Sequence, residues 1–175
     1  MLEDLKKFYK NKKIFITGNT GFKGSWLTMI LNSFNSRLCG YSLSENSKPN
    51  MFNLLNLKHK IKLIKGDVRN FHYLNKSVNK FKPDIIFHLA AQSLVQKSYI
   101  DPLFTVSTNT GGSANILESC RLSKSLKSLI YITSDKCYEN VEWIWGYREN
   151  DKLGGYDAYS SSKAAAENIF SAYLE

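Results

Sequence analysis

The sequence predicts an α/β fold in which a doubly wound parallel sheet carries helices on both faces. Two observations predict it. Short apolar segments alternate along the 175 residues with longer segments of helical periodicity, which is the pattern of strand–helix–strand units joined by right-handed crossovers. Two of the apolar segments, DIIFHL at residues 84–89 and LIYIT at residues 129–133, lack the alternation of a half-exposed strand, as expected for strands covered on both faces.

The predicted elements follow in chain order. Residues 13–17 form the first strand, and residues 24–34 form a helix whose apolar face carries Trp26, Leu27, Ile30 and Leu31. Further strands are predicted at residues 38–43 and 61–65, followed by a helix at 70–81 that stops before a proline. After the fourth strand (84–89) come a helix (109–123), the fifth strand (129–133), a long polar and aromatic loop to about residue 157, and a last helix.

The number of strands bears on the extent of the domain. Five are predicted, whereas a doubly wound dinucleotide-binding sheet commonly has about six, so the sheet is expected to be truncated before its last strands. No internal repeat or linker composition divides the chain. One domain spanning residues 1–175 is therefore expected, and its apolar fraction of 43% suffices for a packed core.

Charge and composition narrow the function classes. The 24 Lys and Arg residues against 15 Asp and Glu give a net charge of +9. These basic residues are scattered, without the dense clusters of a nucleic-acid-binding face, so a phosphate-bearing ligand is the favoured use of the charge. The start of the chain is charged and no apolar run reaches membrane-spanning length, so we expect no membrane contact and a cytoplasmic location. Cys39, Cys120 and Cys137 match no zinc spacing, which predicts reduced thiols and no metal site.

A glycine-rich loop follows the first predicted strand. Residues 18–24 (GNTGFKG) place three glycines at G-x-x-G-x-x-G spacing where a helix begins. Gly18 permits a tight turn, Gly21 lets the backbone approach a pyrophosphate, and Gly24 allows the helix and strand to pack closely. Free N–H groups at the helix N-terminus favour phosphates. A glycine triplet can also serve a merely structural turn, but this context predicts a Rossmann-type dinucleotide site formed by Gly18, Thr20, Gly21, Phe22, Lys23 and Gly24.

The second element of such a site is an acidic residue at the end of the second strand, which binds the adenosine ribose. That residue is missing: Ser42 stands at this place, and the nearest carboxylate is Glu45. Arg37 and Lys48 flank the region and are available to a 2′-phosphate. The local chemistry leaves the choice between NAD and NADP open. We expect NAD, with NADP as the less favoured alternative.

Two further strand ends are expected to line the dinucleotide site. After the third strand, Asp67 is expected to accept a hydrogen bond from the adenine amino group and Val68 to contact the ring, although the same residues suit a turn with a helix N-cap. His88, at the end of the fourth strand, is expected to pack or cap locally. The backbone that follows is expected to lie close to the cofactor, at Leu89, Ala90 and Ala91.

Tyr159 and Lys163 form the candidate catalytic pair. They stand at i and i+4 of the last predicted helix, so both side chains project from one face. A phenol has an unperturbed pKa of about 10, and a neighbouring ammonium lowers it. Tyr-x-x-x-Lys alone is common and usually structural. Here it follows a strand that leads into Ser134, at the edge of the sheet where ligands collect, so Ser134, Tyr159 and Lys163 are expected to converge on a substrate hydroxyl beside a nicotinamide.

Together these features resemble the extended short-chain dehydrogenase/reductase family. They are the glycine loop, HLAA at residues 88–91, Asn109 within TNTGG, the Ser/Thr after the fifth strand, and Tyr-x-x-x-Lys. The resemblance adds Asn109 to the cofactor-binding residues. Longer phrases are similar to the branch of CDP-glucose 4,6-dehydratases in particular: GNTGFKGSWL (18–27), HLAAQSLVQKSY (88–99), TSDKCYEN (133–140) and YDAYSSSK (156–163).

The resemblance implies an NAD-dependent conversion of CDP-glucose to CDP-4-keto-6-deoxyglucose, for O-antigen biosynthesis. Tyr159 would take the proton of the sugar 4-hydroxyl while a hydride passes from C4 to the nicotinamide. Lys163 would hold the nicotinamide ribose, and Ser134 would hydrogen-bond the 4-oxygen. Water would then leave across C5 and C6, and the hydride would return to C6.

The step that removes water involves the two residues after Ser134. In the related dTDP-glucose enzymes these are an Asp-Glu pair, which act as acid and base. Here the acid role carries over to Asp135, whereas Lys136 replaces the carboxylate base. Lys136 can act as a base only if desolvation or a neighbouring cation lowers its pKa.

The resemblance also implies what surrounds this half of the enzyme. Family members continue well beyond the Tyr-x-x-x-Lys helix into a substrate domain that is absent here, so the chain by itself is expected to be inactive. They commonly pair through two helices, which predicts a homodimer formed by the helices from Asn109 to Ser123 and from Asp157 to Tyr173. Three alternatives remain: a sugar-nucleotide 4-epimerase, a GDP-mannose 4,6-dehydratase, and a non-catalytic NAD-binding module.

The long loop before the last helix is rich in aromatic residues. Trp143, Trp145 and Tyr147 either line the sugar pocket or form a local hydrophobic cluster. Pockets and cores are both rich in aromatic residues, so the sequence favours neither interpretation.

Overall fold

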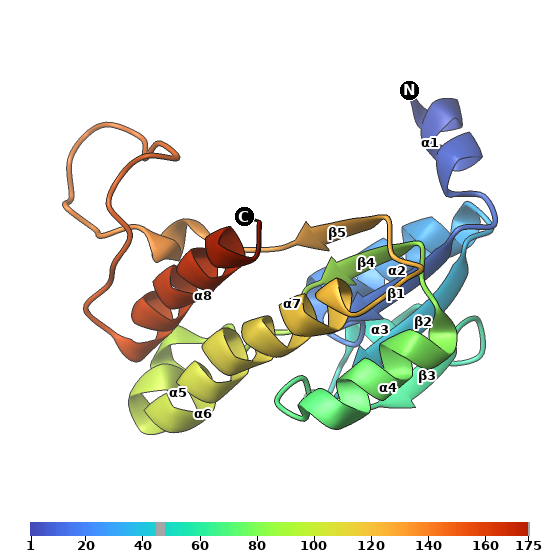
Figure 1. Ribbon diagram of the computed structural model, residues 1–175, viewed down its shortest axis with the longest axis horizontal. Helices are drawn as coiled ribbons and strands as arrows, with labels where there is room; N and C mark the ends of the chain where they lie inside the picture. Colours follow the sequence, from blue (N-terminus) through green and yellow to red (C-terminus); the bar gives the residue numbers. More distant parts are fainter. Residues whose placement is uncertain (45–47, 175) are drawn as a thin grey trace.

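The computed structural model describes residues 1–44 and 48–174 and confirms the α/β fold (Figure 1). In this part of the chain five strands, all parallel, lie in the order β3-β2-β1-β4-β5. They are β1 (Lys13–Thr17), β2 (Arg37–Ser42), β3 (Lys62–Lys65), β4 (Ile85–His88) and β5 (Ser128–Tyr131). The longer helices are α1 (Leu2–Tyr9), α2 (Phe22–Ser33), α4 (Phe71–Phe81), α7 (Gly112–Arg121) and α8 (Ala158–Leu174). Shorter ones are α3 (Met51–Leu54), α5 (Val95–Ile100), α6 (Pro102–Val106) and the turns η1 (Ser107–Gly111) and η2 (Asp135–Cys137).

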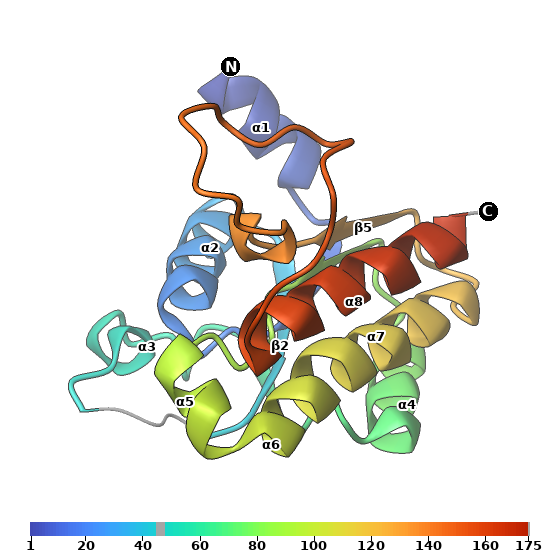
Figure 2. The ribbon, with the colours of Figure 1, turned by 90° about the vertical axis from the view of Figure 1, so that its left-hand side faces the viewer.

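The sheet lies between two helical layers. Helices α4, α7 and α8 cover one face, and α2 covers the other (Figure 2). Because side chains alternate across a strand, β1 sends Phe15 toward α4 and α7, and Ile14 and Ile16 toward α2. Each face has its own buried apolar core, which explains the continuous apolar sequences of the strands.

The carboxyl ends of the central strands lie side by side. Thr17 of β1 pairs with Tyr41 of β2 and with His88 of β4, which in turn pairs with Tyr131 of β5. The segments that follow these strands therefore leave the sheet at one edge. This edge is where parallel sheets bind ligands, and the glycine loop, the residues after β4 and the turn η2 all begin there.

The helix predicted at residues 109–123 was wrong at its start. Helix α6 begins at Pro102, runs into η1, a turn of π-helix, and continues as α7. A start signal was present, because Asp101 accepts a hydrogen bond from the N–H of Phe104 at 2.9 Å and a proline follows it. The prediction did not use this signal, and the structure leaves Leu103 and Val106 of the added segment exposed.

The apolar face predicted for the first long helix was also partly wrong. Trp26 and Ile30 of α2 are 40% and 43% exposed. The residues that α2 buries are mostly small, namely Gly24, Ser25, Thr28 and Leu31. The physical reason is the close approach of this helix to the glycine loop, which leaves no room for large side chains on the inner face.

The cysteines are packing residues of this fold. Cys39 and Cys137 are buried and Cys120 is half-buried, each as a free thiol. Burial raises the pKa of Cys39 to about 11 and that of Cys120 to about 12, so both remain protonated near neutrality. Among residues 1–44 and 48–174, no group of three or more His, Cys, Asp or Glu side chains is arranged to hold a metal ion.

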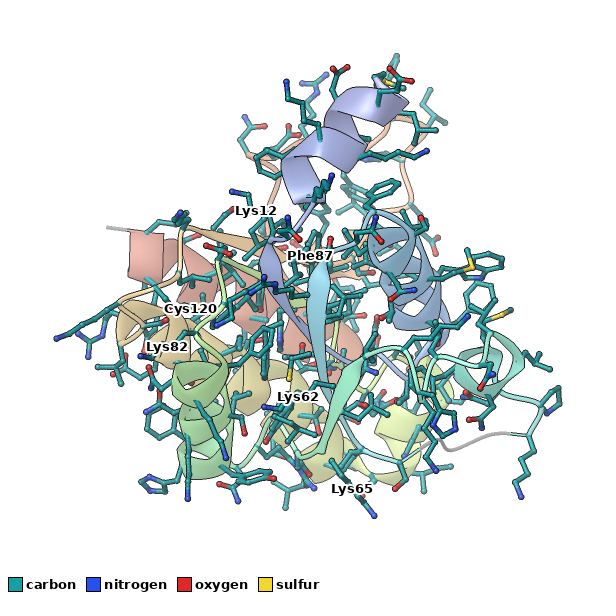
Figure 3. All side chains as sticks on the ribbon, turned by 90° about the vertical axis from the view of Figure 1, so that its right-hand side faces the viewer. Lys12, Lys62, Lys65, Lys82, Phe87 and Cys120 are labelled. Atoms are coloured by element: carbon teal, nitrogen blue, oxygen red, sulfur yellow. The ribbon has the colours of Figure 1, made fainter. Side chains whose placement is uncertain are left out.

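The basic residues are spread over the surface. Figure 3 shows Lys12, Lys62, Lys65 and Lys82 apart from one another on the face that it views. Lys62 and Lys65 belong to the edge strand β3, whereas Lys12 and Lys82 precede β1 and β4. In the described part of the chain, no helix has both the length and the apolar character needed to cross a membrane.

Candidate active site

The glycine loop has the geometry that a phosphate site requires. Gly18 has φ +71°, a conformation that favours glycine, and a Cβ there would lie 2.8 Å from the backbone nitrogen of Ala90. A Cβ on Gly24 would collide with the carbonyl oxygen of Gly18. Gly21 is the N-cap of α2 and donates its N–H to Gly18 at 3.1 Å. These observations support the turn and packing roles predicted for Gly18 and Gly24.

The remaining loop residues surround the start of α2. Phe22 and Lys23 are exposed in its first turn, where free N–H groups and the positive end of the helix dipole favour an anion. Thr20 donates its hydroxyl to the carbonyl of Leu43 at 3.4 Å, and its own carbonyl accepts from Asn50 at 3.3 Å. A dinucleotide pyrophosphate fits this loop, because it is glycine-lined and opens a helix of twelve residues.

The end of β2 contacts a residue of the glycine loop, Asn19, that the sequence interpretation missed. Ser42 donates its hydroxyl to the Oδ1 of Asn19 at 2.9 Å. Asn19 is fully buried, in space that exists only because Gly40 has no side chain. Its Nδ2 has no hydrogen-bond partner among the described residues. The glycine inside β2 was the available signal, since an interior glycine often marks a close approach. Glu45, the nearest carboxylate in the sequence, lies outside the described residues.

The two residues after β3 that were expected to bind adenine, Asp67 and Val68, both contact neighbouring protein groups. The carboxylate of Asp67 binds Arg69, which holds the pKa of Asp67 below its usual range. Tyr41 donates its hydroxyl to the carbonyl of Asp67 at 3.0 Å. Val68 is buried against Gly112 of α7. Asp67 thus remains accessible to a ligand, whereas the side chain of Val68 belongs mainly to the core.

Thr17 connects the glycine loop to the end of β4. Its hydroxyl oxygen accepts the N–H groups of Leu89 and Ala90, both at 3.2 Å, so its single hydrogen is donated to the Nδ1 of His88 at 2.8 Å. That assignment places the imidazole proton on Nε2. Burial, and secondarily the charge of Lys163, lowers the pKa of His88 to about 3, so the ring is neutral. The local packing role predicted for His88 is confirmed, and Ala91 comes after Ala90 in the segment that leaves β4.

Tyr159 and Lys163 lie in the first turns of α8. Asp157 starts this helix by accepting the N–H groups of Tyr159 and Ser160, at 2.8 and 3.0 Å. Tyr159 is buried and Lys163 is half-buried. Burial lowers the pKa of Lys163, and Glu167 partly offsets this effect.

A hydrogen-bond network fixes the turn that carries this pair. Asn109 of η1 donates to the hydroxyl of Ser162 at 2.9 Å and to the carbonyl of Gln92 at 3.0 Å, and it accepts the N–H of Gln92 at 2.8 Å. Ser162 in turn donates to the carbonyl of Tyr159 at 2.7 Å. Both amide hydrogens of Asn109 are therefore used within the protein. Asn109 thus helps to position α8 through Ser162, and the sequence interpretation missed Gln92 and Ser162.

Ser134, Asp135 and Lys136 lie together where η2 begins. Ser134 donates its hydroxyl to Asp135 at 3.1 Å, and the ammonium of Lys136 lies 3.5 Å from the same carboxylate. The hydrogen bond from Ser134, followed by the charge of Lys136, lowers the pKa of Asp135. Both Asp135 and Lys136 are exposed. The described chain therefore supplies neither the protonated form that an acid needs nor the desolvation that a lysine base needs.

The aromatic loop folds on itself. Tyr138 and Tyr147 stack with ring centroids 5.3 Å apart, and Trp143 lies 5.9 Å from Tyr147. Trp143 and Trp145 remain substantially exposed and help to line a cavity of about 180 Å³. The loop therefore forms both a local aromatic cluster and the wall of a cavity.

Known proteins share this architecture. The family model described as GDP-mannose 4,6 dehydratase matches residues 15–175. The CDP-glucose 4,6-dehydratase of Salmonella typhimurium is 46% identical over 168 residues, covering 96% of this chain and 47% of that protein. The CDP-paratose 2-epimerase of Salmonella typhi is 30% identical, covering 92% of this chain and 52% of that protein. The crystal structure of Thermus thermophilus UDP-glucose 4-epimerase complex with NAD matches with a TM-score of 0.77 at 25% identity, covering 91% and 50% of the two chains. The chain spans about half the length of the curated relatives that it matches.

Proposed function

Because the chain belongs to the GDP-mannose 4,6 dehydratase family, we propose that it is the dinucleotide-binding domain of an NAD-dependent dehydratase that converts CDP-glucose to CDP-4-keto-6-deoxyglucose. The observation that carries the choice of substrate is the 46% identity to a CDP-glucose 4,6-dehydratase over nearly the whole chain. The second relative also has a CDP-sugar in its name, at 30% identity. The pair Asp135-Lys136, in place of Asp-Glu, supports the same branch.

Each proposed site residue of this chain has a separate role in binding the cofactor or in catalysis. A bound dinucleotide supplies the hydride acceptor and, at the end, the hydride donor. The glycine loop binds its pyrophosphate, Ser42 faces its adenosine ribose, Asp67 receives its adenine, and Lys163 holds its nicotinamide ribose. Tyr159 takes the proton of the 4-hydroxyl and Ser134 hydrogen-bonds the 4-oxygen. Asp135 protonates the leaving 6-hydroxyl once the substrate covers Asp135, because removal of solvent from a carboxyl group raises its pKa.

The proposed base of the dehydration is Lys136. It is adjacent to Asp135 and takes the place of the carboxylate base of the dTDP-glucose enzymes. Its exposure in this chain means that the bound substrate has to desolvate it before it can remove the C5 proton. The proposed location of the enzyme is the cytoplasm, in nucleotide-sugar metabolism for O-antigen, a proposal supported by three free thiols.

A sugar-nucleotide 4-epimerase is the second candidate function. A UDP-glucose 4-epimerase complex with NAD is among the structures with this fold, and such an enzyme needs the tyrosine and lysine but no acid at Asp135. GDP-mannose remains a less favoured substrate, supported by the description of the family model.

Titration with dinucleotides tests the proposed cofactor. The protein should bind NAD in a calorimeter, and NADP should bind more weakly, since the hydroxyl of Ser42, which is bonded to Asn19, brings no positive charge to a 2′-phosphate. The matched comparison is Gly18→Val, which places a side chain against Ala90 and should abolish binding. A folded wild-type protein that binds neither dinucleotide would show that the site is wrongly assigned.

We also propose a homodimer. Its helices are α7, preceded by η1, and α8. Small residues allow close approach: a Cβ on Gly111 would meet no atom of the described residues within 4 Å, and Ala165 is half-buried on α8. Leu103 and Val106 add exposed apolar surface beside them. Light scattering at micromolar concentration should give twice the mass of the chain, and Ala165→Glu should give the monomer. A monomeric wild-type mass would refute the proposal.

A further inference from the structure

The loop after β3 contains a charge pair with unusually complete geometry. Asp67 and Arg69 are joined by an ion pair at 2.6 Å. The Oδ1 of Asp67 accepts the backbone N–H of Arg69 at 2.9 Å, and both carboxylate oxygens accept from the guanidinium at 2.6 to 3.1 Å. A carboxylate bound in this fork cannot rotate freely, because the planar guanidinium fixes its orientation.

Arg69 uses most, but not all, of the hydrogen-bond acceptor positions of the Asp67 carboxylate. Three N–H groups of Arg69 (the backbone N–H, Nε and Nη2) point at the carboxylate, whereas a carboxylate offers about four lone-pair positions. One acceptor position is therefore left. The side chain of Asp67 is 25% exposed, so a donor from outside the protein can reach it.

The side chain of Arg69 is itself positioned by a contact with helix α6. Its guanidinium carbon lies 4.6 Å from the ring centre of Phe104, and the ammonium of Lys97 lies 4.8 Å from the same centre. The backbone N–H of Phe104 is bound by the capping residue Asp101 at 2.9 Å, which fixes the first turn of the helix that carries the ring. Stacking on an aromatic face combined with a bidentate ion pair is a geometry that arginine provides and lysine does not.

We propose that Arg69 and Phe104 are positioning residues that give the dinucleotide site its selectivity for adenine by holding Asp67 as a fixed hydrogen-bond acceptor. This inference rests on the proposed binding of NAD and on Asp67 as the acceptor for the adenine 6-amino group. An amino group fills the last acceptor position of Asp67. Hypoxanthine has a carbonyl oxygen at that place, which the carboxylate repels.

Calorimetric titration with NAD and with nicotinamide hypoxanthine dinucleotide measures this selectivity. The wild-type protein should bind NAD about tenfold more tightly than the hypoxanthine analogue, the effect of one hydrogen bond to a charged acceptor. Arg69→Ala should reduce the ratio to about twofold or less, since an unheld carboxylate reorients toward water. Arg69→Lys should behave like Arg69→Ala, because it retains the charge but loses the fork and the stack.

Two further variants separate selectivity from stability. Phe104→Leu keeps an apolar side chain on α6 but removes the aromatic face, so it should lower the ratio while Arg69 is still present. Arg121→Ala is the matched control: it removes a bidentate pair with Glu118, at 2.7 Å for both contacts, from the last turn of α7, and it should leave the ratio unchanged. Circular dichroism establishes that each variant is folded.

The possible results have distinct meanings. Wild-type protein that binds no NAD contradicts the proposed function itself. Wild-type protein that binds both dinucleotides equally well refutes Asp67 as the adenine acceptor and this inference with it. If the wild type discriminates, and folded Arg69→Lys and Phe104→Leu variants discriminate equally well, the inference is overturned while the proposed function stands.

Discussion

Replacement of Tyr159 by phenylalanine should abolish oxidation of the sugar in the whole protein. Tyr159 is proposed to take the proton of the 4-hydroxyl, and loss of a positioned general base costs roughly 10²- to 10⁴-fold in rate. Phenylalanine fills the same buried place on α8, so the fold should be kept. Stopped-flow absorbance of reduced nicotinamide after addition of CDP-glucose measures this step, and no signal is expected from the variant.

Tyr156→Phe provides the matched control for this experiment. Tyr156 lies three residues before Tyr159, is 84% exposed, and donates its hydroxyl to Glu139 at 3.0 Å. Its loss should leave turnover within a few-fold of the wild type, as expected for an exposed side chain away from the site. A Tyr159→Phe enzyme with wild-type turnover would exclude Tyr159 as the base.

Replacement of Asp135 by asparagine should separate the two halves of the reaction. Oxidation at C4 does not use Asp135, so it should proceed. Loss of water should slow by about 10²-fold, because asparagine cannot donate an acid proton to the leaving 6-hydroxyl. A 4-keto intermediate that still carries its 6-hydroxyl should accumulate, together with the absorbance of reduced nicotinamide. Rapid quenching followed by mass spectrometry detects that intermediate.

A second carboxylate serves as the control for Asp135. Asp4, in α1, is exposed and pairs with the N-terminal ammonium at 2.8 Å, so Asp4→Asn should retain wild-type dehydration. The result also distinguishes the two candidate functions, since a 4-epimerase has no task for an acid at position 135. Full dehydration activity in Asp135→Asn would show that another group protonates the leaving hydroxyl.

The parts of the site that were predictable from the sequence obey local rules. Gly18 needs a positive φ and Gly24 needs space, and both requirements follow from a strand, a tight turn and a helix within a dozen residues. Tyr159 and Lys163 share a helix face because of their spacing. His88 could be interpreted as a packing residue because it ends an apolar strand.

The parts that were missed depend on contacts between distant segments. Which face α2 buries is decided by how closely Gly24 approaches Gly18, so Trp26 and Ile30 were assigned to the wrong side. Asn109 contacts Ser162 from within the π-helical turn η1. The residue pattern TNTGG does not predict such a turn. The pairing of Arg69 with Phe104 joins a loop after β3 to helix α6, which no spacing rule connects.

The products formed from CDP-glucose test the central claim most directly. The whole protein, incubated with NAD and CDP-glucose, should form CDP-4-keto-6-deoxyglucose, recognised by mass spectrometry as the loss of one water and by the methyl signal of the 6-deoxy sugar in NMR. The chain of residues 1–175 alone should form none, because positioning of the sugar contributes about 7–11 kcal/mol to such a reaction and this chain spans only about half the length of the relatives that it matches. Formation of the 4-epimer of CDP-glucose by the whole protein, without a 6-deoxy sugar, would contradict the account.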